Sequence, residues 1–362
     1  MPTRPLVTSY KADVGLFPDM WHKVGLTLCV VIALGFPFYA SEYWMLVGDL
    51  ALVYIVGSVA LMMLTGFSGQ VSLGHSGFLA VGAYTMAIVG REYQLPYWLI
   101  LPLAGLLSAA VGLAIGAFAL RLRGLYLAIV TIGLLFLIRH VLHYGIPELT
   151  GGSAGTEVPI YVWFGETEAE MYDIYETMVY GPIELNFQQK LYFTFLVIVI
   201  LVVWMAKNLH RTGAGRAMMA VRDQDIAASA LGVDPARAKI LSFGLSSFFA
   251  GIAGGMFAMQ QQFITIDPFH LDMAIAYIAM IVLGGIGSVF GAVAGAIAFA
   301  FLTPLAEYLG PHLPYISELS TSQQSTVLFS ILVCGFLIVE PLGLFGIWLR
   351  IKRFFMAWPF RY

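Results

Sequence analysis

Charge is what this chain of 362 residues has least of. Only 11% of its residues are Asp, Glu, Lys or Arg, whereas 60% are hydrophobic. A soluble domain of this length needs more charge to stay dispersed, so the composition indicates that lipid is the main solvent of the chain. The net charge of -3 carries no information on orientation, which depends on where Lys and Arg lie near the ends of the spans.

The sequence motifs of the common catalytic sites are also missing. A phosphate-binding loop needs a lysine directly after a glycine, and no lysine of this chain follows one. Nothing resembles a hydrolytic triad or a zinc-protease helix, and Cys29 and Cys334 lie far apart within apolar runs, where we interpret them as packing residues. The sequence therefore predicts that this chain is not an enzyme and binds no metal or cofactor. If ATP drives it, ATP and Mg²⁺ must bind to a partner subunit.

Long apolar runs predict an all-α polytopic membrane protein, because helices leave no backbone group unpaired in lipid. We expect a membrane domain at 24–349, an N-terminal segment at 1–23 that is retained without cleavage, and a C-terminal tail at 350–362. About ten transmembrane helices, some of them broken, are predicted near 24–40, 46–65, 74–90, 97–119, 125–145, 191–206, 236–260, 274–286, 289–309 and 326–343.

Two loops of opposite charge predict the orientation. The loop 146–189 carries eight acidic residues and neither Lys nor Arg, whereas the loop 207–239 carries a cluster of basic residues. Because Lys and Arg favour the cytoplasmic side, the first loop should be periplasmic and the second cytoplasmic. Both termini then lie in the cytoplasm, which requires an even number of crossings.

Glycine-rich breaks interrupt two of the apolar runs, at 65–77 and at 283–291. Unwound backbone at membrane depth survives where it lines a cavity or is buried in protein, so both breaks are candidates for the translocation path. The alternative is close helix packing through small residues, which, together with a tight turn, is the favoured interpretation of the second break. The candidate path residues are Gly66, Gly69, Gln70, Ser72, Gly74, His75, Gly284, Gly285 and Gly287.

A short helix is predicted inside the basic loop. Asp225 can cap its first turn, Gly232 can end it in the left-handed conformation, and Asp234-Pro235 can start the next helix. Four apolar residues fall on one side of this two-turn helix and suit docking into a groove on another protein: Ile226, Ala227, Ala230 and Leu231. An ordinary loop between helices is the alternative.

Other polar residues in the apolar runs have milder interpretations. His140 and His143 lie beside Arg139 at the predicted outer end of a span, where they favour anchoring at the interface over metal binding. Asp49 and Glu307 are the acids that the predicted spans place within the membrane, and both should lie at shallow depth in it. Proton coupling through them is a minor alternative.

The first break resembles a family signature. The sequence from Gly66 to His75 is similar to the G-x-x-G-Q-x-S-L-G-H motif of branched-chain amino acid ABC transporter permeases. Further segments in the family's order are Thr150-Gly151-Gly152-Ser153, 215–232, 283–288 and Glu340-Pro341-Leu342-Gly343-Leu344. The resemblance covers about residues 45–347 and is to the M-type rather than the H-type permease (the LivM branch).

This resemblance implies a type II ABC importer permease in the bacterial inner membrane. It implies as partners a second related permease, two ATP-binding cassette subunits and a periplasmic binding protein. Coupling to the ATP-binding subunits would involve Arg216, Arg222, Asp223, Asp225, Ile226, Ala227, Ala230, Leu231 and Gly232.

The substrate class stays open at this point. Branched-chain or other hydrophobic amino acids are the leading substrates, and related systems carry urea, amides or aromatic acids. The loop 146–189 is longer and more acidic than in the plainest members of this group. A secondary transporter or channel for a small solute is the alternative class.

Overall fold

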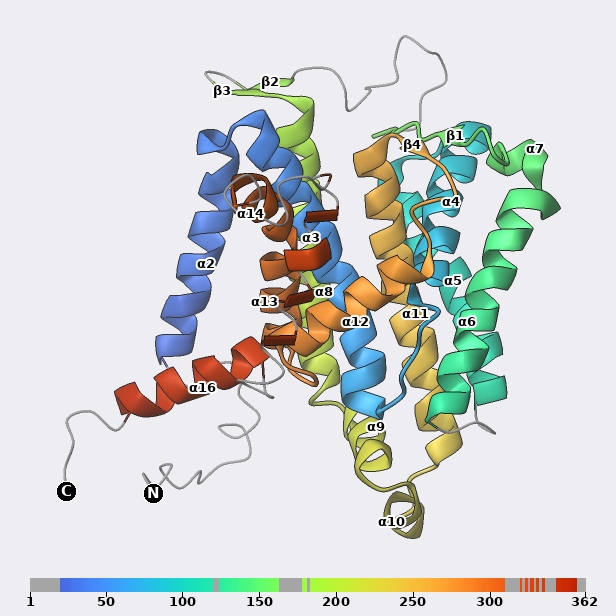
Figure 1. Ribbon diagram of the computed structural model, residues 1–362, viewed down its shortest axis with the longest axis vertical. Coiled ribbons are helices and arrows are strands. Elements are labelled where there is room, and N and C mark those ends of the chain that lie inside the picture. Colours follow the sequence, from blue (N-terminus) through green and yellow to red (C-terminus); the bar gives the residue numbers. More distant parts are fainter. Residues whose placement is uncertain are drawn as a thin grey trace.

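The computed structural model describes residues 20–119, 124–162, 178–180, 183–309 and 343–356, with single positions between 320 and 335. Its described residues are overwhelmingly helical, as predicted (Figure 1). The helices are α2 (Met20–Tyr39), α3 (Glu42–Met62), α4 (His75–Tyr93), α5 (Tyr97–Ala119), α6 (Leu125–His140), α7 (Pro147–Thr150), α8 (Phe187–Leu209), α9 (Gly213–Asp223), α10 (Asp225–Ala230), α11 (Pro235–Gln261), α12 (Leu271–Gly284), α13 (Val289–Ala300), α14 (Leu302–Leu309) and α16 (Gly343–Met356).

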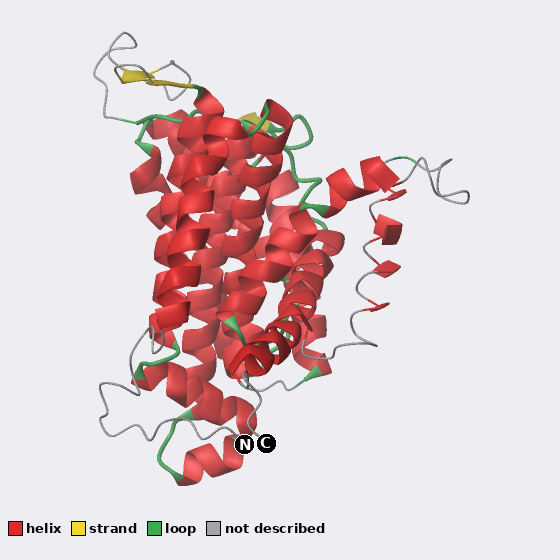
Figure 2. Ribbon diagram, turned by 90° about the vertical axis from the view of Figure 1, so that its left-hand side faces the viewer, coloured by secondary structure: helices red, strands yellow, loops and turns green. Residues whose placement is uncertain are grey.

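Two π-helical turns and four short strands complete the described fold. The turn η1 (Met63–Phe67) continues α3, and η2 (Val141–Gly145) continues α6. The strands form two antiparallel pairs, β1 (Thr156–Glu157) with β4 (Phe263–Ile264) and β2 (Met178–Tyr180) with β3 (Ile183–Leu185). All four strands lie at one end of the bundle, and α9 and α10 lie at the other (Figures 1 and 2).

The helix α11 lies at the centre of the bundle, against α3, α4 and α5. Small residues allow this close approach: a Cβ on Gly251 would lie 2.5 Å from the Ala104 carbonyl oxygen of α5, and a Cβ on Gly82 of α4 would collide with the Gly251 backbone. These two glycines therefore act as packing residues between α11 and its neighbours.

The predicted count of ten spans is not confirmed. Within the described ranges, five helices are long and apolar enough to cross a membrane: Glu42–Phe67, Tyr97–Ala117, Tyr126–Gly145, Phe187–Leu209 and Pro235–Gln261. The predicted spans at 24–40 and 74–90 correspond to α2 and α4, which are helical but are not among these five. Most of the predicted span at 326–343 lies outside the described residues.

The predicted spans 274–286 and 289–309 are corrected by the structure. They form a pair, α12 and α13, bent by 120° at the second glycine break. At 1.5 Å per residue these helices are roughly 21 Å and 18 Å long, too short to cross a hydrocarbon core of about 30 Å separately. The pair is one broken span or a re-entrant hairpin, so the candidate spans among all the described residues number at most six.

The two cysteines also differ from expectation. Cys29 and Cys334 are unpaired and exposed rather than packed inside the bundle.

Candidate functional site

The basic loop folds into two short helices whose ends obey local capping rules. Thr212 caps α9 by accepting a hydrogen bond from the Gly215 N–H at 3.1 Å. The residue that caps α10 is Gln224, and Asp225 is the first helical residue, which corrects the predicted cap by one position. Gly232 takes a φ of +84°, as predicted for the residue that ends this helix.

Two hydrogen bonds close the end of α10 in a Schellman motif. The Val233 N–H donates to the Ala228 carbonyl at 3.0 Å, and the Gly232 N–H donates to the Ser229 carbonyl at 3.0 Å. The next helix begins as predicted, with Pro235 in its first turn and the Asp234 carboxylate accepting from the N–H groups of Ala236 and Arg237.

An apolar knob protrudes from α10. Ile226 is 76% exposed and Leu231 is 85% exposed, and the alanines between them, Ala227 and Ala230, are exposed too. Ala228 on the opposite side is 2% exposed and belongs to the main core. The helix α10 lies beyond the end of the bundle (Figure 1), and its exposed side is apolar.

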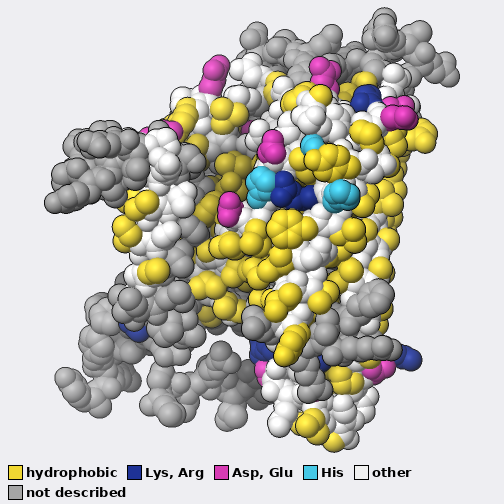
Figure 3. Space-filling model, turned by 45° about the vertical axis from the view of Figure 1, so that its right-hand side comes forward, with side chains coloured by type: hydrophobic (Ala, Val, Ile, Leu, Met, Phe, Trp, Pro, Cys, Tyr) yellow, Lys and Arg dark blue, Asp and Glu magenta, His cyan; other side chains and the backbone are white. Residues whose placement is uncertain are grey.

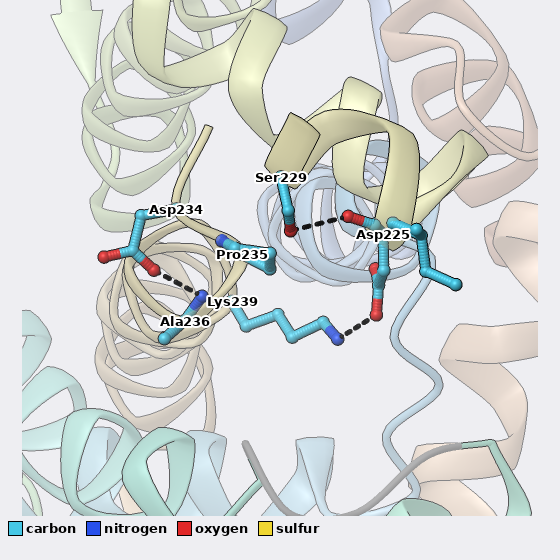
Figure 4. A pocket seen from close by; sticks show the side chains of 7 residues that line it. Asp225, Ser229, Asp234, Pro235, Ala236 and Lys239 are labelled. Atoms are coloured by element: carbon cyan, nitrogen blue, oxygen red, sulfur yellow. Dashed lines mark hydrogen bonds and ion pairs between the residues drawn. The ribbon is translucent and has the colours of Figure 1, made fainter. Parts of the chain in front are cut away.

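An ion pair fixes α10 to the start of α11. The Asp225 carboxylate accepts from Lys239 Nζ at 2.7 Å, and the Ser229 hydroxyl donates to the Asp225 carbonyl at 2.9 Å (Figure 4). The Lys239 side chain is only 14% exposed. A cavity of about 320 Å³ opens beside this pair, between α10 and the first turn of α11.

The first glycine break begins as a π-helical turn. At η1 the chain leaves the α-helical register, and the next three N–H groups bond to Leu64 and Thr65, so that the Gly66 carbonyl has no backbone donor among the described residues. Residues 69–74 run without helical structure before α4 starts at His75. This is a broken helix at the position predicted from the glycines.

Gln70 connects the break to α11. Its side-chain amide, buried at 6% exposure, donates to the hydroxyls of Ser68 at 2.9 Å and Ser242 at 2.8 Å. Further along, the Ser72 hydroxyl accepts from the Gly74 N–H at 3.3 Å, and a Cβ on Gly74 would lie 2.5 Å from the Thr131 carbonyl oxygen of α6. The polar residues of the signature thus tie the unwound segment to two neighbouring helices.

His75 lies in the interior. It is 1% exposed, and its Nε2 lies 3.0 Å from the Gly57 carbonyl oxygen, which can only accept, so the proton is on Nε2. The Tyr277 ring of α12 packs edge-on against His75 at a centroid distance of 5.1 Å.

Tyr277 and Tyr54 are two interior residues that the sequence interpretation missed. Tyr54 packs edge-on against Tyr277 at 5.9 Å, and the Tyr277 hydroxyl is buried without a partner among the described residues. The signal in the sequence was a tyrosine inside an apolar run, because burying its hydroxyl costs free energy unless the hydroxyl finds a hydrogen-bond partner.

The second break is a tight turn that lies directly on the first. Gly285 and Gly287 take φ values of +115° and +89°, which few other residues adopt. A Cβ added to Gly66 would lie 2.7 Å from Gly287 Cα and 2.8 Å from its nitrogen. The two breaks, more than 200 positions apart in the sequence, are therefore in backbone contact.

Arg222 joins the basic loop 207–239 to this contact between the two glycine breaks. Its Nη1 donates to the Gly66 carbonyl at 2.7 Å, while Nε and Nη2 each lie 2.9 Å from one oxygen of Asp223. Gly69 has a φ of +69°, and a Cβ there would lie 2.8 Å from Arg222 Cγ. The structure thus brings together three sets of predicted residues: the end of α9, the first break and the second break.

The remaining predicted coupling residue lies apart from this junction. Arg216 is exposed on α9, and its Nη1 donates to the Arg211 carbonyl at 3.3 Å.

A titratable side chain of the same loop touches η1. The His210 ring packs against Phe67 at 5.5 Å, and burial, followed by the nearby charge of Arg222, lowers the pKa of His210.

The two acids singled out in the sequence differ in burial. Asp49 is fully buried on α3, and neither carboxylate oxygen has a hydrogen-bond partner among the described residues. Glu307 is exposed and accepts from the Tyr43 hydroxyl at 2.6 Å.

A polar group marks the other end of the bundle. His140 and His143 pack against the Tyr144 ring at 5.1 Å and 4.2 Å, near the end of α6. Figure 3 shows His, Arg and acidic side chains gathered above a broad hydrophobic band, which is the pattern of interfacial anchoring. Within the described residues no group of three His, Cys, Asp or Glu side chains could hold a metal ion.

Comparison with known proteins gives a consistent family. The family described as branched-chain amino acid transport system, permease component, matches residues 47–340. The chain is 37% identical over 285 residues to the high-affinity branched-chain amino acid transport system permease protein LivM of Salmonella typhimurium and 36% identical to LivM of Escherichia coli strain K12. Each alignment covers 76% of this chain and 66% of the relative, just under two thirds of its length.

A more distant relative belongs to another import system. The autoinducer 2 import system permease protein LsrC of Escherichia coli O9:H4 is 28% identical over 290 residues, which is 76% of each chain. No solved structure matches.

Proposed function

Because the chain belongs to the family of branched-chain amino acid transport system permeases, we propose that it is the transmembrane permease subunit of an ATP-driven importer. The proposed substrates are branched-chain or other hydrophobic amino acids, as the names of the LivM relatives suggest. A periplasmic binding protein would deliver them, and a second related permease would complete the path.

The observation that carries this proposal is the apolar knob of α10, which lies at one end of the bundle within the basic loop 207–239. A helix of six residues, closed at its C-terminal end by the Schellman motif and fixed by the Asp225–Lys239 ion pair, is a defined shape for docking into a groove of an ATP-binding subunit. Two such subunits would bind ATP and Mg²⁺, since this sequence has no phosphate-binding loop.

The proposed topology is that of a type II importer permease in the bacterial inner membrane. Eight crossings would come from the five candidate spans, α2, α4 and the segment 326–343, and α12 and α13 would form a re-entrant hairpin. These make ten membrane segments with an even number of crossings, so both termini would be cytoplasmic. The acidic segment 146–189 would then face the periplasm.

The proposed translocation path runs beside the two glycine breaks, at the contact of Gly66 with Gly287. Unwound backbone supplies polar groups at membrane depth, and the nearby buried side chains of Gln70 and His75 add more.

Coexpression with the ATP-binding, second permease and binding-protein subunits tests the proposal. We expect the ATP-binding subunits to copurify in mild detergent, and the complex in proteoliposomes to take up radiolabelled leucine only with internal ATP. Uptake that is insensitive to ATP depletion, with no copurifying ATPase, would instead establish a secondary transporter or channel.

A further inference from the structure

The hydrogen bond between Arg222 and the first glycine break lies within this chain, apart from the exposed knob of α10. Its guanidinium is turned into the chain, where it donates to a carbonyl 156 positions away. Arg222 is thus bonded to another part of the permease, with its side chain still 37% exposed, although the sequence interpretation assigned it to coupling with the ATP-binding subunits.

The Gly66 carbonyl needs this donor because of the π-helical turn. In a continuous α-helix the Gln70 N–H would bond to Gly66, but here it lies 3.4 Å from the Leu64 carbonyl. A carbonyl left open at the end of a long helix attracts a cation, because the helix dipole is negative there. Arg222 therefore caps the end of the span Glu42–Phe67 from another part of the chain.

Asp223 fixes the orientation of this guanidinium. It binds the Nε and Nη2 edge and leaves Nη1 to point at Gly66. Charge-assisted hydrogen bonds of this kind are short and directional, so a displacement of Arg222 is passed to the carbonyl that it binds.

The same residue is attached closely to the knob. Only Asp223 and Gln224 separate Arg222 from the first residue of α10, and the Ala228 N–H of α10 donates to the Gln224 carbonyl at 3.0 Å. Ala228 is buried, so α9 and α10 form one packed unit. A force on the knob consequently reaches Arg222 through very little flexible chain.

On its other side Arg222 touches both breaks. Its Cγ lies beneath Gly69, and a Cβ on Gly287 would be 3.7 Å from Nη1 and from the Gly66 oxygen. The hydrogen bond thus lies where the unwound segment meets the tip of the bent helix pair.

We propose that Arg222 is a positioning residue for transport, which passes movement of α9 and α10 to the two glycine breaks through its hydrogen bond to Gly66. This inference rests on the proposed function, since it assumes that ATP-binding subunits move α10. In this proposal the π-helical turn η1 is the element whose register changes when Arg222 moves. Loss of one π turn would rotate the residues that follow it by about 100°.

A spin label in the unwound segment gives a direct test. Val71 is 42% exposed and lies between the Gly66 carbonyl and the start of α4. Cys29 and Cys334 are first replaced by Ser, and a nitroxide is attached at Val71→Cys in the complete complex in proteoliposomes. With the native Arg222, we expect ATP and Mg²⁺ to change the mobility of the label.

The variant Arg222→Gln removes the charge and the cap. We expect it to abolish the ATP-dependent change of the label and to lower the ratio of leucine taken up to ATP hydrolysed by about 5- to 150-fold, the usual span of coupling between sites. The matched control is Arg237→Gln, which removes another cation from the same loop. The Arg237 side chain is 90% exposed and pairs with Asp234. It should keep both the label response and the ratio.

Three results would overturn the proposal: a full label response in Arg222→Gln, an unresponsive label with the native Arg222, or a folded Arg222→Gln chain that no longer copurifies the ATP-binding subunits, which would make Arg222 a docking residue. If Arg222→Gln does not accumulate, Gly69→Ala replaces it, because the added methyl group displaces Arg222 Cγ without changing the charge. A full response in Gly69→Ala would then refute the link. Failure of the native complex to assemble or to import would instead refute the proposed function.

Discussion

Replacing Gly66 by Ala tests the contact between the two glycine breaks. The new methyl group would lie 2.7 Å from Gly287 Cα and 2.8 Å from Gly287 N, where backbone rather than a flexible side chain must move. Overpacking of this kind costs about 1–3 kcal/mol, and a backbone partner places Gly66→Ala near the upper end. Since Ala in place of a helical Gly stabilises by about 0.5–1 kcal/mol, the net loss is about 2 kcal/mol.

The expected result is a lower apparent Tm in detergent at a fixed scan rate. For large domains 1 kcal/mol shifts Tm by about 2–4 °C, so Gly66→Ala should lose about 4–8 °C. The scan rate is fixed because unfolding of such chains is commonly irreversible.

Gly133→Ala on α6 is the matched control. Nothing lies within 4 Å of the position that its Cβ would take, so only the helix propensity changes. It should leave Tm unchanged or raise it by about 1–4 °C, from about 0.5–1 kcal/mol. Equal shifts for the two variants would refute the packing of Gly66 on Gly287.

Three further changes probe the coupling loop. Introducing Asp at both Ala227 and Ala230 should weaken copurification of the ATP-binding subunits about thirtyfold or more, because a buried unpaired charge costs about 2 kcal/mol or more. Replacing Lys239 by Met leaves the Asp225 carboxylate without its ion pair, and hydrogen exchange in α10 should become about tenfold faster or more, since a charged hydrogen bond contributes about 1.5–3 kcal/mol. Burial and Arg222 lower the pKa of His210, so the folded chain favours the neutral ring and should lose stability as the pH falls below about 6.5, a loss that His210→Gln should remove.

Each of these three predictions has a result that would contradict it. The acidic alanine variants are compared with Gly213→Asp, an exposed position with nothing within 4 Å, and equal copurification by both would exclude the knob from docking. Unchanged exchange in the Lys239 variant would show that the ion pair contributes nothing to α10. The same pH dependence with and without His210 would assign that dependence to another group.

Local signals in the sequence were sufficient to predict where α10 ends and where α11 begins. Gly232 and Asp234 act through hydrogen bonds to residues within five positions, so their roles could be predicted from spacing alone. The predicted cap of α10 differs by one residue: Asp225 is the first helical residue, and its carboxylate pairs with Lys239.

Long-range packing could not be predicted in the same way. Arg222 and Gly66 are 156 positions apart, and no pattern of hydrophobicity indicates that they touch. The α12 and α13 pair was predicted as two spans because apolar runs report composition, whereas the 120° bend depends on the φ values of Gly285 and Gly287. The interior position of His75 follows likewise from its contacts with Gly57 and Tyr277.

The β1–β4 strand pair restricts how α4 and α11 can move relative to each other. It ties the loop after α7 to the end of α11, and Arg91 at the end of α4 donates to the Thr156 hydroxyl of β1 at 3.1 Å. Together with the backbone contact of Gly82 on Gly251, this strap fastens α4 and α11 to each other at two heights. Movement of α4 away from α11 at the strand end would therefore require the β1–β4 pair, or the hydrogen bond from Arg91 to β1, to break.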